Sequence, residues 1–427
     1  MAQQLFFSRD TKVYIKKGNF VWDLPVLDGF SFSQATNSSE ITLAEMEGTG
    51  GVSRRGRKQF NDSLAPAEWS FSTYVRPFKS AGSGTGAADS AAKVHAIEEV
   101  LWALFSGPAT YASSAFTNQT VHDADDLDID FSESNKATLG TADIFFVLGD
   151  ANRKVYKLKD CVVNEASLDF DIDGIATINW SGMSSEIIDM TTKTHTTATS
   201  GSVFPPAFDA HRDGGTVDIV AGDVVLDATD AHRMSVVVDP TSSGTATMTG
   251  AVYESTTATD NFIRNRLTQL TVIPTAGTTY IGSLEAAGYD ITLTGGNITM
   301  SNNVTFITPE EIGLVNTPIG HVTGTRSVSG SMNCYLSKDT TANDNSADLW
   351  EDLKGITSVV TNSFALVFKI GGATASTARL EVSLPTCHLE IPTHSIEDVI
   401  SVETAFNALP STIDGTNEAT LKYFPKV

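Results

Sequence analysis

The sequence is poor in cysteine, in basic residues and in long apolar runs. Its 427 residues include three cysteines, Cys161, Cys334 and Cys387. They are odd in number and have no CxxC spacing, so neither a disulfide framework nor a zinc site is expected. No uninterrupted apolar stretch approaches the roughly 18 to 20 residues that a membrane-spanning helix needs. The first residues also lack the features of a secretory signal, and the sequence therefore predicts a protein that stays in the cytosol, away from membranes.

The shortage of basic residues gives the chain a strongly acidic balance. Lys and Arg number 28 against 51 Asp and Glu, for a net charge of −23. Ordinary nucleic-acid binding needs cations that replace the counterions around phosphate, so this balance argues against it. It suits a surface that nucleic acid passes without sticking. The hydrophobic content of 41% is typical of a globular protein, and the length is sufficient for two or three domains.

Motifs for catalysis or cofactor binding are absent from the sequence. No Gly is followed directly by Lys, which excludes a phosphate-binding loop of the GxxxxGK[ST] type. Gly82, Gly84 and Gly86 do not have the dinucleotide-binding spacing, and neither GxSxG nor HExxH occurs. His388 and His394 have no further metal ligands near them in the sequence. We therefore expect no catalytic residues, no cofactor, no metal and no enzymatic activity.

One acidic segment permits two interpretations. Its Asp173-Gly174 pair predicts a two-residue hairpin turn, because these residue types adopt positive φ angles easily. The alternation of Asp169, Asp171 and Asp173 also imitates the start of a calcium-binding loop. The position that should hold a bidentate Glu is Trp180, and flanking helices are missing. The hairpin is the favoured interpretation.

Alternating apolar and polar residues predict a mainly β chain. Strands are expected at 12–16, 20–26, 30–34, 69–75, 143–148, 154–163 and 166–172, and again at 291–300, 322–336, 364–370, 380–391 and 399–405. Residues 36–62 are expected to form a long functional loop. Apolar residues at helical spacing predict a helix over 89–105, which Gly107-Pro108 would end, and a second helix is expected near Leu349.

The second of these two helices repeats the first. Trp102 and Gly107 recur with the same spacing as Trp350 and Gly355. Each helix follows an alternating strand and precedes two strand segments with a single cysteine. A repeat of nearly 200 residues is too long for a solenoid or a propeller blade. We therefore predict a duplicated domain, with the first copy at 1–190, a linker and β-rich insertion at 191–258, and the second copy at 259–427.

A basic cluster interrupts the acidic background inside the long loop. Arg54, Arg55, Arg57 and Lys58 place four bases in five positions. On so acidic a chain, this cluster favours contact with an acidic partner surface, which could belong to a second copy of the chain. The alternative is a loop whose charges are simply solvated.

The segment around this cluster carries a family resemblance. Residues 54–78 read RRGRKQFNDSLAPAEWSFSTYVRPF, and they closely resemble the tail tube protein of long-tailed, siphovirus-type bacteriophages. The resemblance is to the double-length kind, in which two fused tube domains let three chains close a pseudo-hexameric ring. Residues 317–324 and 329–331 look like the matching segment of the second tube domain. The resemblance covers both copies and therefore most of the chain.

The resemblance implies a structural virion protein with two tandem tail-tube-like β-sandwich or barrel domains, each with one α-helix. Trimeric rings would stack into a hollow tube that conducts phage DNA to the host cell without binding it specifically. Arg54, Arg55, Arg57 and Lys58 would contact a neighbouring subunit or ring. Partners would be further copies of the chain and tail proteins such as the tape measure, tail terminator and tail tip. Localisation would be the viral tail, after assembly in the host cytoplasm.

A different class of function is kept as the alternative. A β-rich tail-tip fibre or adhesin that binds a host receptor would have a similar composition. It predicts discrete particles that do not stack.

Overall fold

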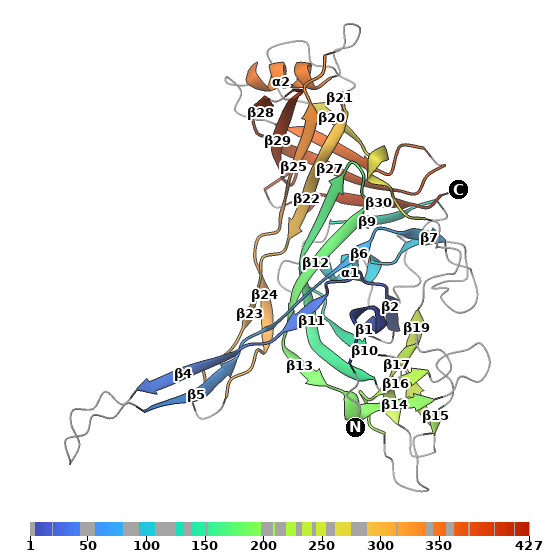
Figure 1. Ribbon diagram of the computed structural model, residues 1–427, viewed down its shortest axis with the longest axis vertical. Coiled ribbons are helices and arrows are strands. Elements are labelled where there is room, and N and C mark those ends of the chain that lie inside the picture. The colour runs from blue at the N-terminus through green and yellow to red at the C-terminus, as the bar shows by residue number, and fades with distance from the viewer. Residues whose placement is uncertain are drawn as a thin grey trace, which may run out of the picture.

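The computed structural model describes most of the chain. The described residues are 5–18, 20–42, 56–79, 94–106, 125–131, 139–149, 153–197, 208–209, 219–227, 233–240, 245–252, 261–274, 288–312, 315–338, 345–355, 363–374, 376–396, 398–413 and 415–426. Their secondary structure is mainly strand, with two α-helices (Figure 1). The predicted β-rich class with one helix in each half is confirmed for this part of the chain.

The elements form three consecutive groups. The first contains η1 (Ser8–Asp10), β1 (Thr11–Lys17), β2 (Phe20–Leu24), β3 (Ser31–Ser33), β4 (Thr36–Thr42), β5 (Arg57–Leu64), β6 (Ala67–Tyr74), β7 (Pro77–Lys79), β8 (Val94–Ala96), α1 (Glu99–Ser106), β9 (Leu127–Asp130), β10 (Ala142–Leu148), β11 (Lys154–Asp171), β12 (Thr177–Ser184) and β13 (Glu186–Asp189). The second contains η2 (Thr191–Lys193), β14 (Thr194–Thr197), β15 (Phe208–Asp209), β16 (Val224–Asp227), β17 (Met234–Pro240), β18 (Thr245–Met248) and β19 (Gly250–Val252). The third contains η4 (Asn265–Leu267), β20 (Gln269–Pro274), β21 (Tyr289–Ile291), β22 (Leu293–Ser301), β23 (Val304–Ile307), β24 (Gly320–Thr323), β25 (Ser327–Tyr335), α2 (Ser346–Gly355), β26 (Phe364–Ile370), β27 (Arg379–Leu389), β28 (Thr393–Ile396), β29 (Ile400–Ala408) and β30 (Thr420–Phe424).

The first and third groups pair their strands in the same order. The first group follows β2–β1–β10–β11–β12–β6–β3. The third follows β21–β20–β26–β27–β29–β25–β22. Each group also contains a hairpin that lies in the chain between the two strands of its last pair. It is formed by β4 and β5 in the first group and by β23 and β24 in the third. Strands at matching places in these two orders are called equivalent below.

Irregularities of pairing also recur at equivalent places. The register of β10 on β11 shifts beside Ala142, which lies opposite Cys161, and that of β26 on β27 shifts beside Phe364, which lies opposite Cys387. Each cysteine thiol donates to the carbonyl oxygen three residues earlier. A register shift changes the direction of a strand, so β11 and β27 are expected to bend at the equivalent residues Cys161 and Cys387.

A pairing of Gly with a large aromatic residue marks a second equivalent place. Trp69 lies opposite Gly182 in the first group, and Gly330 lies opposite Phe406 in the third. A Cβ atom at Gly182 would lie 2.6 Å from Trp69 Cε2, and one at Gly330 would lie 2.7 Å from Phe406 Cζ. Each glycine therefore makes room for the ring opposite it, and the order of small and large residue is reversed between the groups.

One sheet, the long sheet, joins the two halves of the molecule. Strand β11 pairs antiparallel with β22, from Glu165 opposite Ser301 to Asp171 opposite Gly295. The long sheet therefore runs β3–β6–β12–β11–β22–β25–β29–β28. Figure 1 shows β25 and β22 above β11 and β12 at this junction. A second link between the halves pairs β9 with β30.

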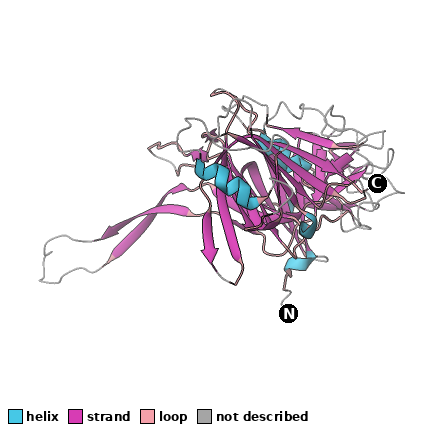
Figure 2. Ribbon diagram, turned by 90° about the horizontal axis from the view of Figure 1, so that it is seen from above, coloured by secondary structure: helices cyan, strands magenta, loops and turns pink. Residues whose placement is uncertain are grey.

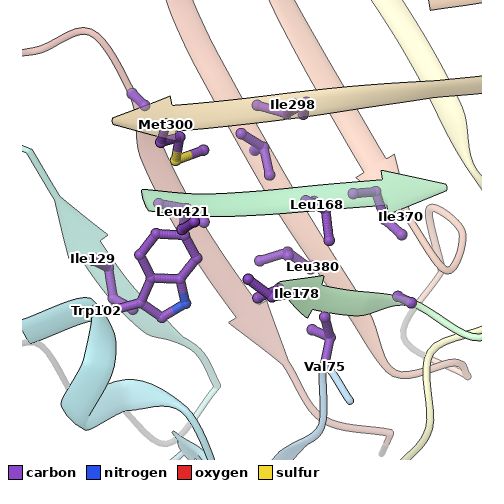
Figure 3. Packing of buried hydrophobic residues seen from close by; sticks show 14 of the residues in the cluster. Val75, Trp102, Ile129, Leu168, Ile178, Ile298, Met300, Ile370, Leu380 and Leu421 are labelled. Carbon is purple, nitrogen blue, oxygen red and sulfur yellow. The ribbon is translucent and has the colours of Figure 1, made fainter. Parts of the chain in front are cut away.

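The core is continuous across this junction. Leu168 and Ile178 of the first half lie in one buried cluster with Ile298 and Met300 of the second, and Trp102 of α1 belongs to the same cluster (Figure 3). All residues of α1 are buried. Burial of this apolar surface stabilises both halves together.

The second group packs against strands β1, β2 and β10 of the first group. Strand β19 pairs parallel with β2, and strands β14, β16, β17, β18 and β15 form a small separate sheet. Tyr14 and Phe145 of the first group pack in a buried cluster with Val224 and Val236 of the small sheet. Strand β14 lies at the start of the predicted linker and insertion at 191–258, so this part of the linker is a strand.

The predicted helix over 89–105 begins too early. Helix α1 starts at Glu99, while Val94 to Ala96 form β8, which pairs with β7. Residues 89–93 lie outside the described residues. The segments 154–163 and 166–172, predicted as two strands, form the single strand β11, with a register shift between Val163 and Glu165.

Two turn predictions also need correction. The expected loop over 36–62 contains strands β4 and β5, and only its central part lies outside the described residues. The hairpin at Asp173-Gly174 exists, but neither residue has a positive φ angle, so the predicted two-residue turn is wrong. The connection is longer because Ile175 bridges Arg264, and Gly174 accepts a backbone hydrogen bond from Asn265 at 3.0 Å.

Candidate functional site

The long sheet has one apolar face and one polar face. Strand alternation directs Trp69 and Phe71 into the core and Ser70 and Ser72 to the other side. The described strand residues on this polar face are Ser31, Ser33, Glu68, Ser70, Ser72, Tyr74, Glu165, Ser167, Asp169, Asp171, Thr177, Asn179, Ser181, Met183, Gly295, Asn297, Thr299, Ser301, Ser327, Ser329, Ser331, Asn333, Tyr335, Thr393, Ser395, Ser401, Glu403, Ala405 and Asn407. They include five carboxylates and, at these positions, neither Lys nor Arg.

Side chains on the polar face bond to one another across strands. Ser72 Oγ donates to Asn179 Oδ1 at 2.6 Å, and Asn179 Nδ2 donates to Asp169 Oδ2 at 3.0 Å, which links β6, β12 and β11. The Ser167 and Thr299 hydroxyls lie 3.3 Å apart across the junction of β11 with β22. These bonds engage several of the donors on the face, and its five carboxylates give it negative charge. Such a surface repels phosphate.

The sequence contains a signal for this face. The run from Trp69 to Ser72 alternates aromatic residues with Ser, and Ser329 and Ser331 alternate with Val328, Gly330 and Met332. The alternation predicts that one face is polar. It does not predict that eight such strands lie side by side, which depends on pairing between distant segments.

The described residues of the basic cluster, Arg57 and Lys58, lie on the hairpin of β4 and β5, which is called the arm. Figure 2 shows the arm extending from the body of the molecule. Arg57 and Lys58 are exposed on β5, whereas Arg54 and Arg55 lie outside the described residues. Arg57 forms a 3.6 Å ion pair with Glu40 on β4, an exposed pair that contributes little to stability. Lys58 Nζ lies over the Phe60 ring, 5.1 Å from its centroid.

The base of the arm is tied to the second half. Leu64 N–H donates to the Asn316 carbonyl oxygen at 2.8 Å, and Asn316 N–H donates to that of Asp62 at 3.2 Å. Asn316 lies between β23 and β24, so the equivalent hairpins of the two halves meet there. Ile41 and Ile319, 54% and 72% exposed, add apolar surface to these hairpins. Exposed apolar and basic side chains on projecting hairpins are suited to contact with another molecule.

A buried polar cluster fastens α1 to the last strand of the chain. Trp102 Nε1 donates to the Tyr423 hydroxyl at 2.6 Å, and this hydroxyl donates to Glu98 Oε1 at 2.8 Å. Burial raises the pKa of Glu98 to about 7, although the bond from Tyr423 and the charge of Arg76 oppose the shift. No local sequence pattern predicts this cluster, because Trp102 and Tyr423 are far apart in the chain.

A second polar contact crosses the same boundary. Arg326 of the second half donates to Glu418 at 2.8 Å and, at 2.9 Å, to the Phe131 carbonyl oxygen of the first half. On the outer strands, Lys422 pairs with Asp128 at 2.7 Å. The halves are therefore held together by ionic and hydrogen-bonded contacts as well as by the long sheet.

Within the described part of the chain, no group of three or more His, Cys, Asp or Glu side chains could hold a metal ion. Asp169 and Asp171 end β11, and Asp173 pairs with Arg266 at 3.2 Å. The ring of His394 packs edge-on against Trp350, with centroids 4.9 Å apart. None of the described helices is both long and apolar enough to cross a membrane.

Comparison with known proteins supports one class, the tail tube proteins of long-tailed bacteriophages. The chain is similar to Tail tube protein pb6 of Escherichia phage T5, with 27% identity over 435 residues that cover 100% of this chain and 77% of the relative. No protein-family model matches the chain. The resemblance found in the sequence is thereby confirmed, and the similarity supports a structural role in a phage tail tube.

Proposed function

We propose that the chain is the major tail tube subunit of a siphovirus-type phage, and that three copies close a pseudo-hexameric ring. The similarity to a tail tube protein supports the class of function. The matching strand orders of the two halves support two quasi-equivalent units in each chain, so that three chains supply six positions around a ring. The observation that carries the proposal is the pairing of β11 with β22, which continues one sheet from the first unit into the second.

The unit boundaries follow the sequence repeat. Residues 1–190 form the first tube domain, residues 191–258 the insertion, and residues 259–427 the second tube domain. The recurring register shifts beside Cys161 and Cys387 support an origin by duplication. The insertion lies on the outside of the ring, because its small sheet covers the face of β1 and β10 that points away from the long sheet.

The polar face of the long sheet lines the bore of the tube. Its carboxylates, Glu68, Glu165, Asp169, Asp171 and Glu403, repel the phosphates of DNA. Phage DNA therefore passes through the tube to the host cell without specific binding. Closing the sheet into a barrel also removes exposed strand edges, which otherwise invite aggregation.

Assembly partners follow from this role. The chain contacts further copies of itself within and between rings, and it meets the tape measure, tail terminator and tail tip proteins. It is assembled in the host cytoplasm and resides in the tail of the virion. The tube needs no cofactor and carries out no catalysis.

The arm supplies the contact between stacked rings. Replacement of Arg57 and Lys58 by Glu should leave folding intact, because both side chains are exposed, and should shorten or abolish tubes by repulsion from an acidic neighbour. A matched control replaces Arg9 and Lys193, which are also exposed, by Glu. Negative-stain microscopy of purified protein would measure tube length. Unchanged tubes in this variant, and in a second one that also replaces Arg54 and Arg55 by Glu, would remove the proposed role of Arg54, Arg55, Arg57 and Lys58 in stacking.

A further inference from the structure

The first unit buries part of its outside under the insertion. The sheet of β2, β1, β10 and the first part of β11 has one face toward the core and one face, called the outer face, that points away from the long sheet. On the outer face Tyr14, Phe145 and Val155 are fully buried. They pack in one cluster with Val224 and Val236 of the small sheet, and Figure 1 shows β16 and β17 beside β1 and β10. The outer face is therefore an apolar surface with the insertion as its cover.

The matched cysteines identify the equivalent positions in the second unit. Val155 and Glu381 lie at the same distance along the chain from Cys161 and Cys387. Strand pairing carries this match across each sheet. It gives four pairs of equivalent residues, with the first unit before the second: Tyr14 and Thr271, Phe145 and Val367, Val147 and Lys369, and Val155 and Glu381.

The second unit is polar at most of these positions. Thr271, Lys369 and Glu381 are half-buried, whereas their equivalents in the first unit are buried. Lys369 and Glu381 lie opposite each other on neighbouring strands, where opposite charges are favourable. The second unit can therefore present this face to water. The first unit would expose large apolar side chains if its cover were removed, which is unfavourable.

The insertion depends on the same contact. Its small sheet has apolar side chains on both faces, because strand alternation directs neighbouring residues to opposite sides. Val224 and Val236 face the first unit, whereas Val225 and Val237 form a separate buried cluster with Ile219. Without the first unit, the face of Val224 and Val236 would lose the cover that it has in the structure. Each partner therefore buries a face that the other needs.

Backbone pairing joins the insertion to the same sheet. Strand β19 pairs parallel with the edge of β2, with Gly250 opposite Phe20 and Val252 opposite Trp22. The equivalent of β2 in the second unit is β21, which among the described residues pairs with β20 alone. Separation of the insertion from the first unit would therefore break strand pairing as well as apolar contacts.

We propose that the insertion is an obligatory third layer of the first unit, and that the insertion and the first unit unfold together. An appended surface domain would instead unfold by itself and leave the first unit intact. The inference depends on contacts within a single chain, so it goes beyond the proposed tube and does not require it. The chemistry of the two outer faces also gives the reason why the first unit carries a cover and the second unit does not need one.

Hydrogen exchange of the intact purified chain tests this cooperativity. Val236→Ala removes apolar contacts on the insertion side of the interface, where Val236 is 3% exposed. It should increase the exchange rates of amide groups in β1 and β10 by about tenfold or more, together with those in β16 and β17. The matched control is Val238→Ala on the same strand, which is 43% exposed and should change these rates little.

A second variant gives the first unit the outer face of the second. It combines four substitutions by the equivalent residues: Tyr14→Thr, Phe145→Val, Val147→Lys and Val155→Glu. Because the equivalent residues are compatible with water in the second unit, β1 and β10 should remain protected from exchange. Strands β16 and β17 should lose their protection, since the apolar surface that holds them is gone. If this variant does not fold, the comparison of Val236→Ala with Val238→Ala decides.

The outcomes separate this inference from the proposed function. Faster exchange confined to β16 and β17 in the Val236→Ala chain would overturn the inference, because a separate domain behaves in that way. Full protection of β16 and β17 in a folded four-residue variant would overturn it as well. Both measurements use the single chain, so neither result bears on the tube. Failure of the unsubstituted protein to form tubes would count against the proposed function and leave this inference standing.

Discussion

Trp102, Tyr423 and Glu98 form a buried chain of hydrogen bonds between the two halves of the molecule. The Tyr423 hydroxyl accepts from the Trp102 indole and donates to the Glu98 carboxyl group. A buried donor without its partner costs about 1–3 kcal/mol, so each member of this chain depends on the others. Glu98 is the sensitive member, since burial raises its pKa to about 7 from the ordinary value of 4.5.

The raised pKa of Glu98 makes stability depend on pH in a defined direction. Below the ordinary value the carboxyl is neutral in the folded and unfolded chains, and the full stability is present. As the pH rises from 4.5 to about 7, the unfolded chain ionises this carboxyl group while the folded chain keeps it neutral, and about 3 kcal/mol of stability is lost. Glu98→Gln should remove this loss, so that the variant gains stability relative to the unsubstituted protein between pH 5 and pH 8. Urea unfolding of both proteins measures the difference, and a difference that is constant with pH would contradict the assignment.

At the scale of single elements, the sequence predicted strands where one face of the strand is buried. Strand β26 was predicted with its observed limits, because its residues alternate between buried and half-buried positions. The strands of the arm were not predicted, because the described side chains of β4 and most of β5 are exposed on both faces and show no alternation.

The predicted start of the first helix was wrong for a different reason. Val94 has the apolar character expected of a helix residue, but the segment Val94–Ala96 pairs with β7 and is buried as a strand. The pairing of this segment with β7 therefore determined its structure, although its local sequence favoured a helix. The polar face and the junction of β11 with β22 depend on pairing between segments far apart in the chain, which the local sequence does not encode.

Gly330 tests the packing of equivalent strands. A Cβ atom there would lie 2.7 Å from Phe406 Cζ and would also crowd the Asn297 carbonyl oxygen. Gly330→Ala should lower the free energy of unfolding by about 1–3 kcal/mol, as overpacking does. Gly320→Ala is the matched control, since no atom lies within 4 Å of its added Cβ. Chemical denaturation measures both variants, and equal stability of the two would show that the close contact of Gly330 with Phe406 has no energetic role.

For the whole molecule, the sequence repeat predicts a division into two units and an insertion, because Trp102 and Gly107 recur with the same spacing as Trp350 and Gly355. The structure adds an asymmetry. The described strands of the insertion pack against β1, β2 and β10 of the first unit, and β9 of the first unit pairs with β30 of the second. The proposed ring of three chains would therefore have six similar positions on its inner side and a threefold pattern on its outer side.

Electron cryo-microscopy of the assembled tube tests this account most directly. A ring should contain six similar β units that come from three chains, joined by one sheet around the bore, with insertion density outside every second unit. A ring built from six chains, with an insertion outside every unit, would contradict the account, as would two halves of unlike topology or a particle that does not stack.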